Sequence, residues 1–161
     1  MTYFSRLLAP FLITVATAVA SDDIGDVILT LNFETEGPDS VEFTLEDLKA
    51  IGERQFSTTT IWTTGQQTFS GVSLDAFLRF KGIDSGKILA SAINDYTVQI
   101  PLSDATADGP LIAYRLNGEE MSIRDKGPLW IVYPYDSKPE YQTEVIYSRS
   151  IWQLDRIAIV D

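Results

Sequence analysis

The most informative stretch of this sequence is Leu111-Ile112-Ala113-Tyr114-Arg115-Leu116-Asn117-Gly118-Glu119. Its first six residues form an apolar run of strand length, which predicts a strand over 111–116. Asn117-Gly118 follows at once, and this pair tolerates positive φ at both central positions of a tight turn. The stretch therefore predicts a β-hairpin, and with it a protein in which strands dominate.

The same strand and turn pattern extends to both sides of the hairpin. Val27–Phe33 alternates apolar and polar residues with the period of a half-buried strand. Two short helices are expected: one capped by Thr44 that stops near Gly52, and one capped by Ser73 that ends at Gly82. The other expected strands are Phe56–Thr64, Lys87–Ala92, Tyr96–Ile100, Leu129–Tyr133 and Leu154–Val160. These elements predict a strand-dominated α+β fold.

The N-terminal residues have the pattern of a secretion signal. Arg6 precedes a mostly apolar run over residues 7–19, and Ala18-Val19-Ala20 has the small residues that a signal peptidase needs. A membrane anchor is the alternative, but the run is shorter than the about 20 apolar residues that span a bilayer. We therefore expect residues 1–20 to be a signal peptide cleaved after Ala20, residues 21–26 to be a flexible leader, and residues 27–161 to be a single domain. That domain is expected to be periplasmic or secreted, with no membrane insertion after cleavage.

Composition excludes several classes of function. The chain has 12 Lys and Arg against 23 Asp and Glu, and removal of Arg6 with the signal changes the net charge from −11 to 11 − 23 = −12. A charge of this sign repels nucleic acid, so no nucleic-acid partner is expected. The chain has no cysteine and no histidine, which excludes a Ser-His-Asp triad, a cysteine nucleophile and the usual zinc sites. No catalytic residue and no metal ligand are predicted.

Five blocks of the sequence, in order, resemble the molybdopterin-binding domain of the sulfite oxidase family. Phe69-Ser70-Gly71-Val72-Ser73-Leu74 is similar to an aromatic-x-Gly-Val-x-Leu lead into a helix, and Gly127-Pro128-Leu129 is similar to a Gly-x-Pro-Leu segment with one residue fewer. The blocks are Phe69–Leu78, Asn94–Pro101, Leu111–Glu119, Gly127–Pro134 and Ile151–Ile157. The resemblance implies a mixed sheet or barrel with a few short helices, and a molybdopterin-dependent oxidoreductase.

The chain differs from this family at the positions that would bind the metal and the cofactor's phosphate. The family's metal-binding cysteine would follow the strand that here reads Thr58–Thr64, which offers only hydroxyls and an indole. Thiolate suits a high-valent metal, whereas a neutral hydroxyl is a poor substitute. The expected basic histidine is replaced by the neighbourhood of Lys126, and the expected arginine by Trp130, which cannot pair with phosphate. We therefore expect no cofactor, with molybdopterin as the alternative that the resemblance implies.

The residues that map to the family's cofactor cleft form the predicted ligand site. A cleft with one cation, one carboxylate and aromatic walls suits a small organic or cationic ligand, although core packing is the alternative for each aromatic residue. The predicted site residues are Thr60, Trp62, Asn94, Asp95, Tyr96, Lys126 and Trp130. The segment Tyr133–Tyr141 is expected to be an exposed loop, and its three tyrosines could contact a protein.

Three hypotheses about function follow from this interpretation. The first is a non-catalytic periplasmic or sensory module that binds a small molecule or an envelope protein through the former cofactor cleft. The second is a molybdopterin-dependent oxidoreductase whose metal has no cysteine ligand. The third is a structural domain whose cleft is filled by Trp62 and Trp130. The sequence leaves the ligand, the partner and the oligomeric state open.

Overall fold

The computed structural model of the chain describes residues 25–33 and 40–161. The predicted signal peptide and most of the predicted leader lie outside the described residues. Within them the strand-dominated α+β prediction is confirmed, because the strands form two sheets and the helices are short. These strands make open sheets and no closed barrel.

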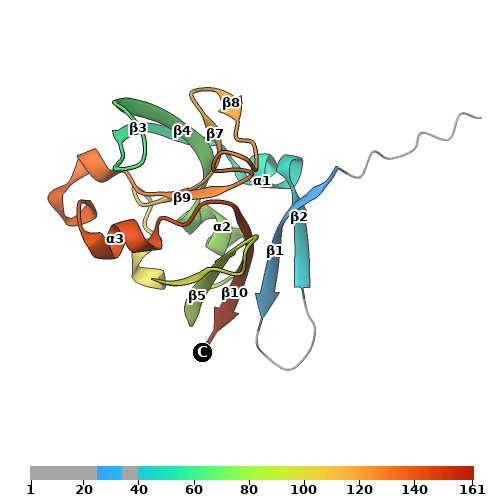
Figure 1. The fold of residues 1–161 in the computed structure, drawn as a ribbon. Helices are drawn as coiled ribbons and strands as arrows, with labels where there is room; N and C mark the ends of the chain where they lie inside the picture. The colour runs from blue at the N-terminus through green and yellow to red at the C-terminus, as the bar shows by residue number, and fades with distance from the viewer. Residues whose placement is uncertain (1–24, 34–39) are drawn as a thin grey trace, which may run out of the picture.

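The first sheet carries the N-terminal and C-terminal strands side by side. Its order is β2-β1-β10-β5-β6, and β1 pairs with β10 in parallel while the other pairs are antiparallel (Figure 1). Leu29 and Leu31 of β1 are fully buried, as the alternating pattern predicts. The strands are β1 Val27–Phe33, β2 Ser40–Thr44, β5 Lys87–Ala92, β6 Thr97–Pro101 and β10 Leu154–Val160.

The second sheet contains the predicted hairpin and is antiparallel throughout. Its order is β3-β4-β7-β8, and β9 also pairs with β7. Asn117 and Gly118 join β7 to β8 with φ of 52° and 86°, which confirms the positive-φ turn. The strands are β3 Arg54–Thr59, β4 Gln66–Ser73, β7 Leu111–Leu116, β8 Glu119–Glu120 and β9 Trp130–Val132.

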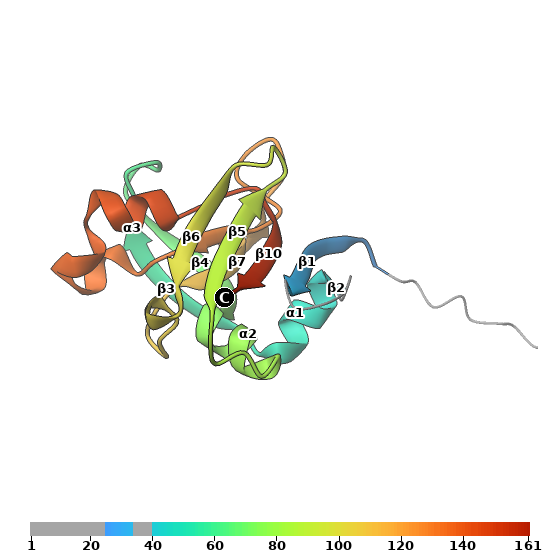
Figure 2. The ribbon, with the colours of Figure 1, turned by 90° about the horizontal axis from the view of Figure 1, so that it is seen from below.

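The two predicted helices are present with their predicted caps. Thr44 caps α1 (Leu45–Ile51) in a capping box with Asp47, and α1 is followed by Gly52. Ser73 caps α2 (Leu74–Phe80). The sequence analysis missed α3 (Glu144–Arg149), whose N-cap is Thr143. The short 3₁₀ helices are η1 Leu102–Asp104, η2 Tyr135–Ser137 and η3 Pro139–Tyr141. In both orientations, α3 lies at the opposite side of the molecule from β1 (Figures 1 and 2).

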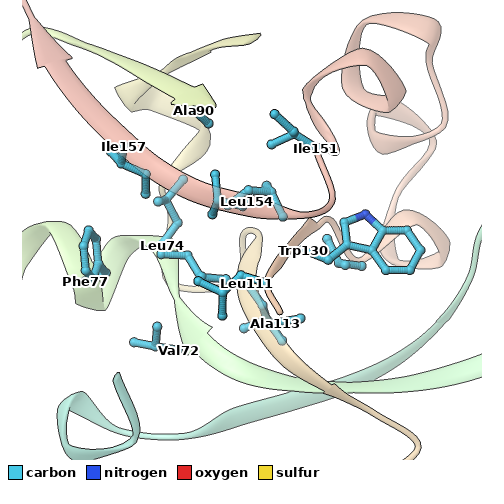
Figure 3. Close-up of a cluster of buried hydrophobic side chains, with 14 of the residues drawn as sticks. Val72, Leu74, Phe77, Ala90, Leu111, Ala113, Trp130, Ile151, Leu154 and Ile157 are labelled. Atoms are coloured by element: carbon cyan, nitrogen blue, oxygen red, sulfur yellow. The ribbon is translucent and has the colours of Figure 1, made fainter. Parts of the chain in front are cut away.

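The core lies between the two sheets and α2. Leu154 and Ile157 of β10 meet Leu74 of α2 and Leu111 of β7 there, and all four are fully buried (Figure 3). No helix among the described residues is long and apolar enough to cross a membrane.

Three expectations about local structure were wrong. The strand predicted over Phe56–Thr64 runs only to Thr59, because the chain then turns through residues 60–65, with Gly65 at positive φ. Trp130 is fully buried and therefore belongs to the core. The segment Tyr133–Tyr141 is not an exposed loop of tyrosines. It folds into two 3₁₀ turns, and its tyrosine rings pack inward at 0–7% exposure.

Candidate functional site

One cavity of the described residues, here called the aromatic pocket, has a volume of about 280 Å³. Its walls come from four segments: the turn after β3, the β5–β6 loop, α3, and the segment between α3 and β10. The lining residues are Trp62, Ala92, Asn94, Tyr96, Tyr147, Ser148, Ser150, Ile151, Trp152 and Gln153. The pocket therefore gathers side chains that are up to about ninety residues apart in the sequence.

Trp62 is the central wall of the aromatic pocket. Its ring is half-buried and meets Trp152 at 5.5 Å and Tyr147 at 5.9 Å between centroids, in edge-to-face geometry. It also packs on Trp130 at 5.8 Å and on Tyr135 at 6.2 Å. Edge-to-face pairs of this kind are favourable for aromatic rings. Trp62 is thus held by rings that come from four other parts of the chain.

A network of threonine hydroxyls fixes the turn that carries Trp62. Thr60 Oγ1 lies 2.7 Å from Thr63 Oγ1 and accepts a 3.1 Å hydrogen bond from the Trp62 backbone N–H. One residue earlier, Asp136 accepts two 2.6 Å hydrogen bonds from the hydroxyl and the backbone N–H of Thr59. These hydrogen bonds lower the pKa of Asp136. The hydroxyl of Thr60, a predicted site residue, is therefore engaged within this turn.

Backbone conformation at the opposite wall is unusual. Asp95, between the lining residues Asn94 and Tyr96, has φ of 65°, and the lining residue Gln153 has φ of 50°. The two segments are joined, because the Ile93 N–H donates to the Gln153 carbonyl at 2.9 Å. A left-handed conformation costs a non-glycine residue free energy and is often found at functional sites. Two of the three such residues in the described chain lie at this pocket.

A buried polar layer supports the pocket from behind. Trp130 Nε1 donates to the Ser150 carbonyl at 3.2 Å, and the Tyr135 hydroxyl donates to Ser150 Oγ at 2.6 Å. Burial raises the pKa of the Tyr135 phenol, so the phenol remains a donor. Nearby, Asp104 accepts hydrogen bonds from Tyr133 at 2.7 Å and from Arg149 at 2.8 Å. The buried polar groups of Trp130, Tyr135 and Ser150 are paired with one another, and a fully paired network of this kind makes the structure behind the pocket rigid.

Lys126 interacts with two tryptophan rings. Its Nζ lies 4.7 Å from the centroid of Trp152 and 5.5 Å from that of Trp130. A cation at this distance from an indole face is attracted by the ring quadrupole. Lys126 does not line the pocket itself, so its charge acts through Trp152 rather than by direct contact with the cavity.

The structure brings together some of the predicted site residues and separates others. Trp62, Asn94 and Tyr96 line the pocket, whereas Thr60, Asp95, Lys126 and Trp130 do not. Asp95 instead pairs with Arg156 at 2.6 Å.

Trp130 lies behind the pocket with no exposed surface, which corrects its assignment as a ligand-contacting wall. The sequence analysis missed Tyr147, because it missed α3. It also left Trp152 and Gln153 out of the predicted site, although the resemblance covered both.

The fold and the pocket define a strand-dominated domain with two sheets and one aromatic pocket beside α3. A family model described as the oxidoreductase molybdopterin binding domain matches residues 23–136. This match covers well over half of the 161 residues, so the chain belongs to the oxidoreductase molybdopterin-binding domain family. The resemblance stated from the sequence blocks is thereby confirmed. No curated protein matches the chain.

The residues at the pocket do not fit the family's cofactor. Cysteine and histidine are missing from the entire chain, and the Thr60 hydroxyl is engaged within its own turn. Among the described residues, no three Asp or Glu side chains are grouped so that they could hold a metal ion. No lining residue is a lysine or arginine that could bind the cofactor's phosphate. The cavity also lies just below the about 300–1,000 Å³ typical of sites for drug-sized ligands.

Proposed function

We propose that this chain is an exported, non-catalytic member of its family that binds a small organic ligand in the aromatic pocket, as a sensory or binding module. Its periplasmic or secreted location rests on the signal-like residues 1–20. One observation carries the proposal: the turn that follows β3, where the resemblance puts the metal ligand, instead presents Trp62 to an aromatic pocket.

The chemistry of the pocket suits binding better than catalysis. Its walls are mainly aromatic, with a few amides and hydroxyls, which is the usual make-up of a small-molecule site. Asn94 offers an amide group for orientation, whereas the Gln153 amide already donates a 2.6 Å hydrogen bond to the Ile123 carbonyl. Neither side chain is a general acid or base. The pocket is held by paired polar groups and hydrogen-bonded turns, so it is formed before the ligand arrives.

Ligand binding is tested by a thermal-shift screen of one-ring and two-ring aromatic compounds against the wild-type domain and Trp62→Ala. A compound present at 100 times its dissociation constant stabilises the native state by about 2.7 kcal/mol through mass action. For a domain of this size, that corresponds to a rise in Tm of roughly 5–10 °C. The proposal predicts such a rise for the wild type and its loss in Trp62→Ala.

A matched control separates loss of the pocket from general damage to the domain. Phe56 is also a half-buried aromatic residue, and it packs on Phe69 in the second sheet, away from the pocket lining. Phe56→Ala should keep the ligand-induced shift. A panel in which no compound raises the Tm of the wild type would contradict the proposal.

Family membership favours a second candidate, a molybdopterin-dependent oxidoreductase whose metal has no cysteine ligand. The two candidates differ in metal content, because the oxidoreductase must retain molybdenum when it is isolated from a host that makes the cofactor.

An envelope protein is the alternative partner of a binding module, and it would place an apolar side chain in the same pocket. Trp62→Ala weakens that interaction too, so a co-purified protein lost in this variant would indicate it.

A further inference from the structure

The polar side chains that line the aromatic pocket are all uncharged. They are Asn94, Ser148, Ser150 and Gln153, and no lining residue is acidic or basic. A fully charged ligand loses most of its hydration on entering such a pocket and finds no opposite charge there. The lining therefore favours an uncharged ligand that takes only a few hydrogen bonds from amides.

Lys126 makes the pocket unfavourable for a cation. Aromatic walls usually attract cations, but here the ammonium of Lys126 already lies 4.7 Å from the centroid of Trp152 and 5.5 Å from that of Trp130. A ring stacked on Trp152 from the cavity would lie about 3.5–4 Å from it, and thus roughly 8 Å from the ammonium. Two positive charges at that distance repel each other. At an effective dielectric constant between about 20 and 80, the repulsion energy corresponds to about a 2- to 30-fold loss of affinity for the cation.

An anion is disfavoured as well. It loses its hydration in the same uncharged lining, and the attraction of the Lys126 ammonium at roughly 8 Å offsets this by only about 2- to 30-fold in affinity.

We propose that the ligand is an uncharged, planar molecule of one or two fused rings, with Lys126 selecting against cations through Trp152. This inference rests on the proposed ligand-binding function. The cavity of about 280 Å³ sets the size. The rings of Trp62 and Trp152, with centroids 5.5 Å apart and planes at 73°, form a corner in which a planar ligand can stack on one ring and meet the other edge-on.

The test compares probes that differ in charge but hardly in shape. 4-Methylquinoline is neutral at neutral pH, N-methylquinolinium is a cation with the same number of non-hydrogen atoms, and 1-naphthoate is an anion. Each is titrated into the ¹⁵N-labelled domain, which has only three tryptophan indole N–H signals to follow. The variants are Lys126→Met and, as a control, Lys138→Met, whose ammonium lies 4.1 Å from Tyr141 and away from the aromatic pocket.

The neutral probe should bind the wild type and shift the indole signals of Trp62 and Trp152. The cation should bind more than about 2-fold more weakly, because its loss of hydration adds to the repulsion by Lys126, and the anion should also bind more weakly than the neutral probe. Lys126→Met should raise the affinity of the cation relative to the neutral probe by about 2- to 30-fold, and Lys138→Met should leave the difference unchanged. The inference is overturned if the cation or the anion binds the wild type as tightly as the neutral probe, or if Lys126→Met does not change the ratio. If no probe shifts these signals, the pocket is not a ligand site and the proposed function fails with the inference.

Discussion

Replacing Trp130 with alanine should remove a large part of the stability of this domain. Trp130 has no exposed surface and packs edge-to-face on Phe69 at 5.3 Å and on Trp62 at 5.8 Å. Truncation of a fully buried tryptophan costs about 3–5 kcal/mol. It also leaves the buried Ser150 carbonyl without its donor, which adds about 1–3 kcal/mol if no water replaces the indole N–H. Because domains typically have about 5–15 kcal/mol in total, Trp130→Ala should be barely folded.

Urea unfolding followed by far-UV circular dichroism measures this change directly. Trp62→Ala is the comparison, because Trp62 belongs to the same cluster but is only half-buried, and its truncation should cost roughly half as much. A loss for Trp130→Ala of less than about 1 kcal/mol would refute the reasoning, since it lies below any buried aromatic truncation. Trp130 would then be a replaceable wall of the cleft, as the sequence analysis expected.

Three further variants test the packing and charges of the fold. A β-carbon on Gly71 would lie 2.1 Å from a backbone oxygen of β7, so Gly71→Ala should lower the free energy of unfolding by about 1–3 kcal/mol or more in the same urea assay. Gly25→Ala is the control: its β-carbon would make only ordinary contacts, so it should change that free energy by less than about 0.5 kcal/mol. The pKa of Asp136 is lowered by its hydrogen bonds from Thr59, so its carboxylate stabilises the native state above pH 3.8, and that contribution is lost as the pH falls through the folded pKa. When Tm is measured as a function of pH, Asp136→Asn should lack this loss of stability in acid. Burial raises the pKa of Asp155, whose Oδ1 is buried without a hydrogen bond, so ionisation of this carboxyl group opposes folding. The stability of the wild type should therefore fall as the pH rises from below 3.8 through the folded pKa, whereas Asp155→Asn should lack that fall and have the higher Tm at neutral pH.

Local sequence signals predicted much of the fold because the physical cause of each element is local. The caps at Thr44 and Ser73 and the Asn117-Gly118 turn were found because capping and positive φ depend on residues only a few positions apart. The end of β3 was misplaced because Thr60-Ile61-Trp62 has strand-like composition. Its side chains instead hydrogen-bond within a turn, which composition alone does not reveal.

The site was predicted in part, because long-range packing decides which side of an aromatic ring faces a cavity. Trp62, Asn94 and Tyr96 lie together at one pocket, whereas the burial of Trp130 depends on Phe69 and on the segment around Ser150. No local pattern reports such a contact. Tyr147 was missed for the same reason: α3 has only six residues, too few for a helical repeat to be distinguished from a loop.

The claim that this family member has given up molybdopterin chemistry is tested most directly by the molybdenum content of the domain. The protein is produced with its own N-terminal segment in a host that makes the cofactor, isolated without chelators, and analysed by inductively coupled plasma mass spectrometry. The account predicts no more molybdenum than in a matched blank, and no visible absorption band. Near-stoichiometric molybdenum that stays with the protein through gel filtration would contradict it and establish the oxidoreductase instead.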